Sequence, residues 1–158
     1  MSPTSVSTKQ VTINAAFLKE IKEDNQHLKQ LWDKAVPLAE HVETATNHWP
    51  ELIEHFAEMR DQLALHFSLE EAYGYFDDAI DIAPQLSTVA DCLRNEHTNL
   101  FAEVRDLADA AIDAKVGLDD EIAKVLSAFQ NFRQRFERHE ESELKLILQA
   151  MDDIGGGD

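Results

Sequence analysis

Cysteine is almost absent from this sequence: Cys92 is the only one among 158 residues. A single cysteine excludes an internal disulfide, and it also excludes a zinc site built from several cysteines. Cys92 stands five residues before His97, and this spacing sets it off the helical face that carries His97. We therefore interpret Cys92 as a packing residue.

Basic residues are scarce as well, with 14 Lys and Arg against 31 Asp and Glu and a formal charge of −17. Such an acidic chain repels nucleic acid and anionic membranes, so we expect neither as a partner. The N-terminal residues lack the apolar core of a signal peptide, and no apolar run approaches the ~18 residues of a membrane span. The expected compartment is the cytoplasm, and the sequence names no protein partner.

A strand pattern is also missing, because nowhere do apolar and polar residues alternate with a period of two. Apolar residues instead recur at intervals of three and four, as they do on one face of an α-helix. At 158 residues and 44% hydrophobic, the chain is long enough for one domain with a buried core. We predict an all-α fold, an up-down-up-down antiparallel four-helix bundle with an N-terminal arm.

The predicted segments follow from periodicity and from the positions of proline and glycine. The Ser/Thr-rich residues 1–12 form the arm, residues 13–154 the bundle, and the glycine-rich residues 155–158 a flexible tail. The predicted helices cover about 14–42, 50–72, 84–114 and 118–153, with a connection at 43–49 and the longest loop at 73–83. Pro37 should kink or end the first helix near its last turns.

Two of the apolar stripes run directly into an imidazole and a carboxylate. In the second predicted helix the stripe through Leu63 continues to His66 and Glu70, and in the fourth it continues to His139 and Glu143. A spacing of four residues sets each His and Glu on the same helical face, one turn apart. A buried charge costs several kcal/mol unless it is paired or bound to a metal, so both pairs require a partner.

The other two helices each add one histidine at the same level of the bundle. His97 interrupts the middle of the third stripe, and His27 stands beside the stripe of the first helix. A helix rises 1.5 Å per residue, and these two histidines and both His/Glu pairs lie at similar distances from the same end of an antiparallel bundle. We therefore expect them in one layer. This coincidence favours a metal site over a structural polar network, which would leave two buried carboxylates without cations. His55, eleven residues before His66, is interpreted as structural.

Four imidazoles and two carboxylates exceed what one tetrahedral zinc ion uses, and they suit two octahedral metals bridged by carboxylates. Ferritin-like di-iron bundles use Glu-x-x-His motifs, which this sequence lacks. The order here is one His, then His-x-x-x-Glu, then one His, then His-x-x-x-Glu, on four successive helices. This order resembles the hemerythrin-like, or HHE cation-binding, family over roughly residues 14–150.

The resemblance implies a role for each of these residues and a cofactor of two non-haem iron ions, with or without an oxo or hydroxo bridge. The implied terminal ligands are His27, His66, His97 and His139, and the implied bridging carboxylates are Glu70 and Glu143. Oxygen-carrying hemerythrins have a fifth histidine one turn from the one on the third helix, where this chain has Leu93 and Phe101. Water, an exogenous ligand or a carboxylate can fill that place. Tyr73 and Asp24 are candidates, although we favour a supporting role for both.

Three classes of function follow from the resemblance. The leading one is a di-iron protein that binds dioxygen, or a related molecule such as nitric oxide or peroxide, for sensing, storage or delivery. The second is a di-iron oxidase or reductase that acts on peroxide or nitric oxide, and the third is an iron-handling or metal-stabilised interaction module. We expect a binding protein rather than an enzyme. We also expect the aromatic loop with Tyr73, Tyr75 and Phe76 to cover the metal end.

Overall fold

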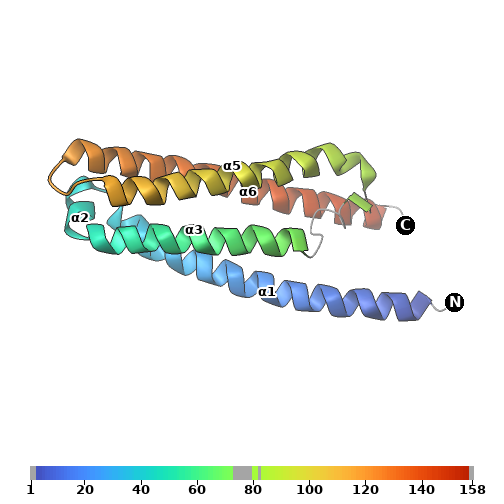
Figure 1. Cartoon of the computed structure of the whole chain (residues 1–158). Coiled ribbons are helices and arrows are strands. Elements are labelled where there is room, and N and C mark those ends of the chain that lie inside the picture. Colours follow the sequence, from blue (N-terminus) through green and yellow to red (C-terminus); the bar gives the residue numbers. More distant parts are fainter. Residues whose placement is uncertain (1–2, 73–79, 82, 157–158) are drawn as a thin grey trace.

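A computed structural model describes residues 3–72, 80–81 and 83–156. The elements are α1 (Pro3–Leu38), α2 (Val42–Asn47), α3 (Trp49–Ala72), the 3-10 helix η1 (Pro84–Leu86), α5 (Ser87–Asp113) and α6 (Asp119–Gly156) (Figure 1). No strand occurs in this part of the chain, and the prediction of an all-α helical bundle is confirmed. None of the helices within the described ranges is long and apolar enough to cross a membrane.

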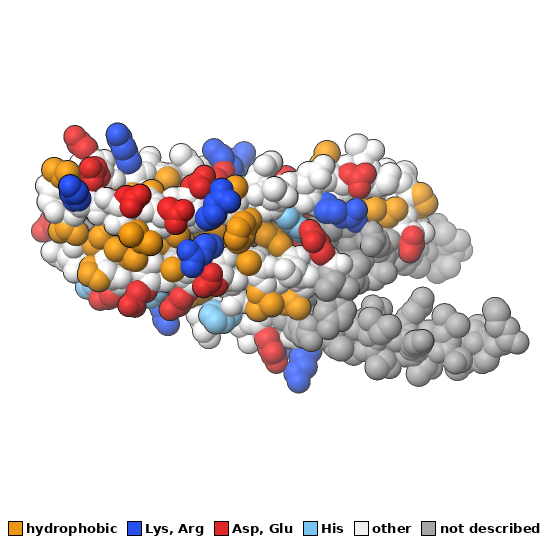
Figure 2. Space-filling model, viewed as in Figure 1, with side chains coloured by type: hydrophobic (Ala, Val, Ile, Leu, Met, Phe, Trp, Pro, Cys, Tyr) orange, Lys and Arg blue, Asp and Glu red, His pale blue; other side chains and the backbone are white. Residues whose placement is uncertain are grey.

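The long helices α1, α3, α5 and α6 lie along a common axis, and the short α2 lies at one end of them (Figure 1). α3 packs against both α1 and α5, α5 packs against α6, and α2 contacts α3 and α6. Figure 2 shows acidic side chains spread over one face rather than gathered in a single patch. The negative charge is therefore distributed over this face of the bundle.

Several helix ends coincide with residues that favour them. α1 ends at Leu38, one residue after Pro37, which has no N–H to donate to the preceding turn. α3 has Pro50 at its second position, where the missing N–H costs nothing. The turn before α6 contains Gly117 at φ 104°, a left-handed conformation that glycine adopts without steric cost. The three acidic residues of the first turn of α6 suit the positive end of its helix dipole.

The helices differ from the predicted boundaries at three places. Residues 3–12, predicted as an arm without helical periodicity, belong to α1, because Ser and Thr are only moderately poor helix formers and a helix extends readily once nucleated. Residues 42–47 form α2, separated from α1 because His41 is extended at φ −133° and ψ 143°. α6 continues through Gly156, three residues beyond the predicted end, because glycine weakens a helix by only about 1 kcal/mol.

The buried core consists of two apolar clusters with a polar layer between them. The large cluster contains most of the buried aromatic rings, and the small cluster consists of Ala83, Ala90, Leu93, Leu146 and Ala150. Along α5, His97 lies between Leu93 of the small cluster and Leu100 of the large one. Along α6, the buried His139 and Glu143 follow the large cluster and precede the small one. The polar layer is thus enclosed by apolar packing on both sides.

The large cluster provides a test of the packing. Phe129 is fully buried, and its ring centroid lies 5.7 Å from that of Trp32 and 5.2 Å from that of Phe56. Phe129→Ala should lower the free energy of unfolding by about 3–5 kcal/mol, because it removes these contacts and leaves a cavity. Urea denaturation followed by tryptophan fluorescence measures the change. Ile112→Ala, at a side chain that is 59% exposed, should change it by less than about 0.5 kcal/mol, and equal losses would contradict this core.

Candidate metal centre

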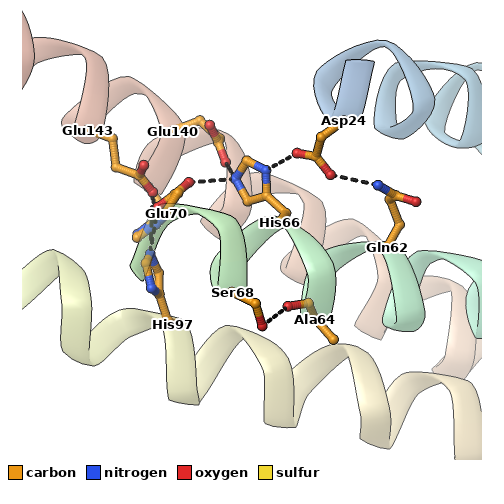
Figure 3. Close-up of polar contacts among 10 residues, drawn as sticks. Asp24, Gln62, Ala64, His66, Ser68, Glu70, His97, Glu140 and Glu143 are labelled. Atoms are coloured by element: carbon orange, nitrogen blue, oxygen red, sulfur yellow. Dashed lines mark hydrogen bonds and ion pairs between the residues drawn. The ribbon is translucent and has the colours of Figure 1, made fainter. Parts of the chain in front are cut away.

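The polar layer contains buried groups from α1, α3, α5 and α6. Among the described residues, the buried polar or charged side chains are Asp24, His66, Glu70, His97, His139 and Glu143, each at most 4% exposed. Figure 3 shows carboxylates and imidazoles from these helices turned toward one another. The helical spacing predicted from sequence explains the convergence, since each His/Glu pair on α3 and α6 lies on the inward face of its helix.

The first cluster of possible ligands consists of Glu70, His97, His139 and Glu143. One ligand atom from each lies within 4.8 Å of the others. His97 Nε2 is 3.1 Å from Glu70 Oε2 and 3.6 Å from Glu143 Oε1, and His139 Nε2 lies against Glu143 Oε1. The ring centroids of His97 and His139 are 5.0 Å apart. Two imidazoles and two carboxylates therefore face a common point.

The second cluster consists of His66, Glu70 and Glu140, again with ligand atoms within 4.8 Å of one another. His66 Nε2 lies 2.7 Å from Glu70 Oε1 and 2.9 Å from Glu140 Oε1 (Figure 3). Glu70 thus belongs to both clusters, with Oε1 toward His66 and Oε2 toward His97. A carboxylate in this position can bridge two cations.

Carboxylates also lie behind the three histidines. They are Asp24 at Nδ1 of His66, Glu71 3.7 Å from Nδ1 of His97, and Glu96 3.6 Å from Nδ1 of His139. Of these carboxylates, Asp24 is the buried one, and it also accepts a hydrogen bond of 2.6 Å from Gln62 Nε2 (Figure 3). Histidine ligands of metals commonly have such an outer carboxylate, which orients the ring and fixes the nitrogen that faces the metal. In this arrangement Nε2 of each ring faces inward.

The histidines hold protons strongly in the absence of a metal. Burial disfavours the imidazolium of His66, but hydrogen bonds to Asp24, Glu140 and Glu70 outweigh it and raise its pKa to about 12. Burial likewise opposes the charge on His97, yet its contacts with Glu143 and Glu70 raise its pKa to about 9. Without a metal, protonated rings therefore neutralise part of the negative charge of the layer.

The two glutamates differ although both are buried. Burial alone would raise the pKa of Glu70, but its contacts with the imidazoles of His66 and His97 lower it to about 2. Burial raises the pKa of Glu143, and the negative charges of Glu70 and Glu140 reinforce that shift. Neighbouring carboxylates with like charges are expected to move apart in pKa in this way.

Hydrogen bonds among the described residues do not satisfy every buried nitrogen and oxygen atom of the layer. Glu70 Oε2, Glu143 Oε1 and both nitrogens of His139 are buried, and although imidazoles lie close to the two carboxylate oxygens, none of these atoms has a well-aligned hydrogen bond in the described part of the chain. Unsatisfied buried donors and acceptors are costly, and a shared cation would satisfy several of them together. Imidazole nitrogen and carboxylate oxygen are ligands that suit iron and related divalent metals. The residues present therefore fit a metal site, and Glu70 belongs to both groups of possible ligands.

Five of the six predicted ligands come together in the two clusters, namely His66, Glu70, His97, His139 and Glu143. His27 is exposed and lines a surface groove with Asp24 and Gln62. Asp24 instead points inward from α1, because it is in helical register with the buried Leu28 and Leu31, whereas His27 stands beside that buried face. Tyr73 and the aromatic loop lie outside the described residues.

Glu140 is the cluster member that the sequence analysis missed. Its side chain is 36% exposed, so it does not belong to the buried stripe of α6. A weak signal was present, because Glu140 stands four residues after Phe136 and three before Glu143, on the border of that stripe. Its contact with His66 depends on how α6 packs against α3, which a single helical pattern does not reveal.

The comparisons with known proteins give one match. The sequence model described as the hemerythrin HHE cation binding domain matches residues 16–151. The search among curated proteins and the search among solved structures each find no match. The matched range includes every residue of both clusters.

The raised histidine pKa values predict how the metal-free protein responds to pH. A group with a raised folded-state pKa stabilises the fold fully below its unfolded value, here 6.5, and loses this contribution as pH rises toward about 9 for His97 and about 12 for His66. The melting temperature in chelator should therefore fall between pH 6 and pH 9. His41→Gln, at an exposed histidine, should keep this trend, whereas a constant or rising melting temperature would contradict the assigned contacts.

Proposed function

This chain belongs to the hemerythrin HHE cation-binding domain family, and on that premise we propose that it is a non-haem di-iron protein. Its ligand would be dioxygen or a related small molecule, nitric oxide or peroxide, bound for sensing, storage or delivery. The observation that carries the proposal is the pair of clusters that share Glu70, because two cations use all of these donors and one cation does not.

The proposal assigns the donors to two irons. His97, His139 and Glu143 would hold one iron, His66 would hold the other, and Glu70 would contribute one oxygen to each. The distances around Glu70 support this division, with 2.7 Å from Oε1 to His66 Nε2 and 3.1 Å from Oε2 to His97 Nε2. Each histidine must release its inward proton to bind, so iron uptake is accompanied by proton release. A bridging role for Glu143 and a ligand role for His27 stay predictions.

The proposal also includes the arrangement and location of the domain. We assign the four long helices to an up-down-up-down antiparallel bundle, which Figure 1 supports because α2 and the α5–α6 connection lie at one end and α1 begins at the other. This order lets four helices contribute side chains to one layer. We assign the protein to the cytoplasm, as expected from its sequence.

Aromatic side chains form part of the wall around the centre. The Phe67 ring stacks on His97 with centroids 4.3 Å apart and an interplanar angle of 16°. Its centroid also lies 5.4 Å from that of His66 and 6.0 Å from that of His139. The ring centroid of Phe136 lies 6.1 Å from that of His66. These rings hold the imidazoles in place and exclude water, and an apolar wall suits a small uncharged ligand.

Iron in this layer would supply a redox-active ion with a coordination position for a small ligand. Among the described residues, the second cluster contains one histidine, His66, whereas the first contains two. Fewer protein ligands leave more positions for exogenous molecules, which favours a di-iron oxidase or reductase acting on peroxide or nitric oxide as the second candidate. Repeated turnover with a reductant would identify the enzyme, and reversible coloured oxygen binding would identify the carrier or sensor. An iron-handling module would show neither.

The di-iron proposal predicts two iron equivalents per chain. Metal-depleted protein loaded anaerobically with Fe(II) should bind two ions, because the donors form two clusters. Elemental analysis measures the number, and Mössbauer spectroscopy after oxidation measures the magnetic coupling expected for irons that share a carboxylate. Saturation at one uncoupled iron would exclude the dinuclear centre.

Ligand and bystander histidines should differ in their effect on the stability gained from metal. Saturating metal should raise the melting temperature by roughly 5–10 °C, because binding to the folded state alone adds to its stability. His139→Ala should remove most of this gain, whereas His55→Ala should retain it. The compared quantity is the difference between metal-bound and metal-free protein for each variant, so that lost packing cancels. A full gain in His139→Ala would contradict the assignment of the layer.

A further inference from the structure

A surface groove of about 450 Å³ reaches the second cluster from solvent. Trp32 and Asp33 of α1 line one side, and Arg133, Phe136, Glu137, Glu140 and Glu141 of α6 line the other. The acidic lining residues are Asp33, Glu137, Glu140 and Glu141. Arg133 is the basic residue of the lining, and its Nε lies 3.2 Å from Glu137 Oε1. The groove therefore carries a negative charge that attracts cations.

Glu140 connects this groove to the polar layer. Its side chain is 36% exposed at the groove, yet its Oε1 lies 2.9 Å from Nε2 of His66, whose side chain is only 3% exposed (Figure 3). The other members of both clusters are buried. A cation that moves along the groove thus meets a carboxylate that already contacts the inner imidazole.

The donors around His66 leave one direction for a cation. Asp24 occupies Nδ1, so Nε2 is the nitrogen available for binding. Two carboxylate oxygens converge on Nε2, Glu70 Oε1 at 2.7 Å and Glu140 Oε1 at 2.9 Å. A cation bound to Nε2 would therefore have one nitrogen and two oxygens within reach, a set that suits iron or manganese.

We propose that Glu140 is a ligand of the second cation and that this cation reaches the layer through the groove. The proposal rests on the di-iron function above and specifies how its two positions differ. The first cluster is buried and offers two imidazoles, whereas the second offers one imidazole and opens to solvent at Glu140. The second position consequently binds its cation more weakly, fills later and empties first.

Glu140→Gln tests the assignment, because glutamine keeps the shape of the side chain but removes the charge. Chelator-treated full-length protein is titrated anaerobically with Fe(II), and bound equivalents and affinities are measured by competition with a chromogenic chelator. Wild type should bind two equivalents. In Glu140→Gln the second affinity should fall by at least about 100-fold and the first stay unchanged, since even supporting residues typically change metal affinity by about 10–100-fold.

Two further variants make the result decisive. Glu141→Gln removes a charge from the same groove without touching His66, so it should still bind two equivalents. Glu140→Asp keeps a carboxylate on a shorter side chain, so its second affinity should lie between those of wild type and Glu140→Gln. Circular dichroism checks that each variant remains helical.

The outcomes separate this proposal from the di-iron function. One equivalent in wild type would refute the dinuclear centre itself. Two equivalents in wild type together with two at unchanged affinity in Glu140→Gln would refute only the role of Glu140. Equal binding by the Gln and Asp variants, or loss of both equivalents in a helical Glu140→Gln protein, would also overturn it, because neither fits a carboxylate that serves the second cation alone.

Discussion

The burial of carboxylates in an apolar core is the constraint on which the rest of this structure depends. Glu70 and Glu143 are each 2% exposed in a layer enclosed by two apolar clusters. A buried carboxylate is tolerated only when positive charge and hydrogen bonds compensate for lost water. Imidazoles provide that charge, and they surround the two glutamates from α3, α5 and α6. The packing of the helices therefore brings together the imidazoles that the two buried carboxylates need.

The same constraint explains why the two clusters of the layer differ. Glu143 lies against two imidazoles in the enclosed part of the layer, whereas Glu140 reaches His66 from a groove open to solvent. The buried cluster has two imidazoles to offset its carboxylates, whereas at the partly exposed Glu140 solvent also screens the charge. Glu70 connects the two environments because its oxygens face different histidines.

Much of this arrangement follows from helical periodicity. The stripe that predicted a helix at about 50–72 corresponds to α3 at Trp49–Ala72, and its polar positions His66 and Glu70 are buried as expected. The family resemblance implies His27 as a ligand, whereas in the structure His27 is exposed and Asp24, three residues earlier on α1, contacts His66. Asp24 is in helical register with the buried Leu28 and Leu31, which explains why it faces inward, and a ligand role for His27 stays a prediction.

Other features depend on contacts between helices and could not be obtained from one helix at a time. Glu140 borders the stripe of α6 and acquires a partner only because α3 brings His66 within 2.9 Å. The helical state of residues 3–12 likewise depends on extension from the following turns, since their composition alone favours no structure strongly. The apolar period of a helix thus predicts which of its faces is buried. Which residues at the border of that face join the polar layer depends on the neighbouring helices.

Anomalous X-ray diffraction at the iron absorption edge, from crystals of the iron-loaded protein, tests the central claim most directly. A di-iron centre in this layer should give two peaks, one beside His97, His139 and Glu143 and one beside His66 and Glu140, with Glu70 between them. A layer without anomalous density, with iron only at surface carboxylates, would contradict the assignment of these buried residues to a metal centre.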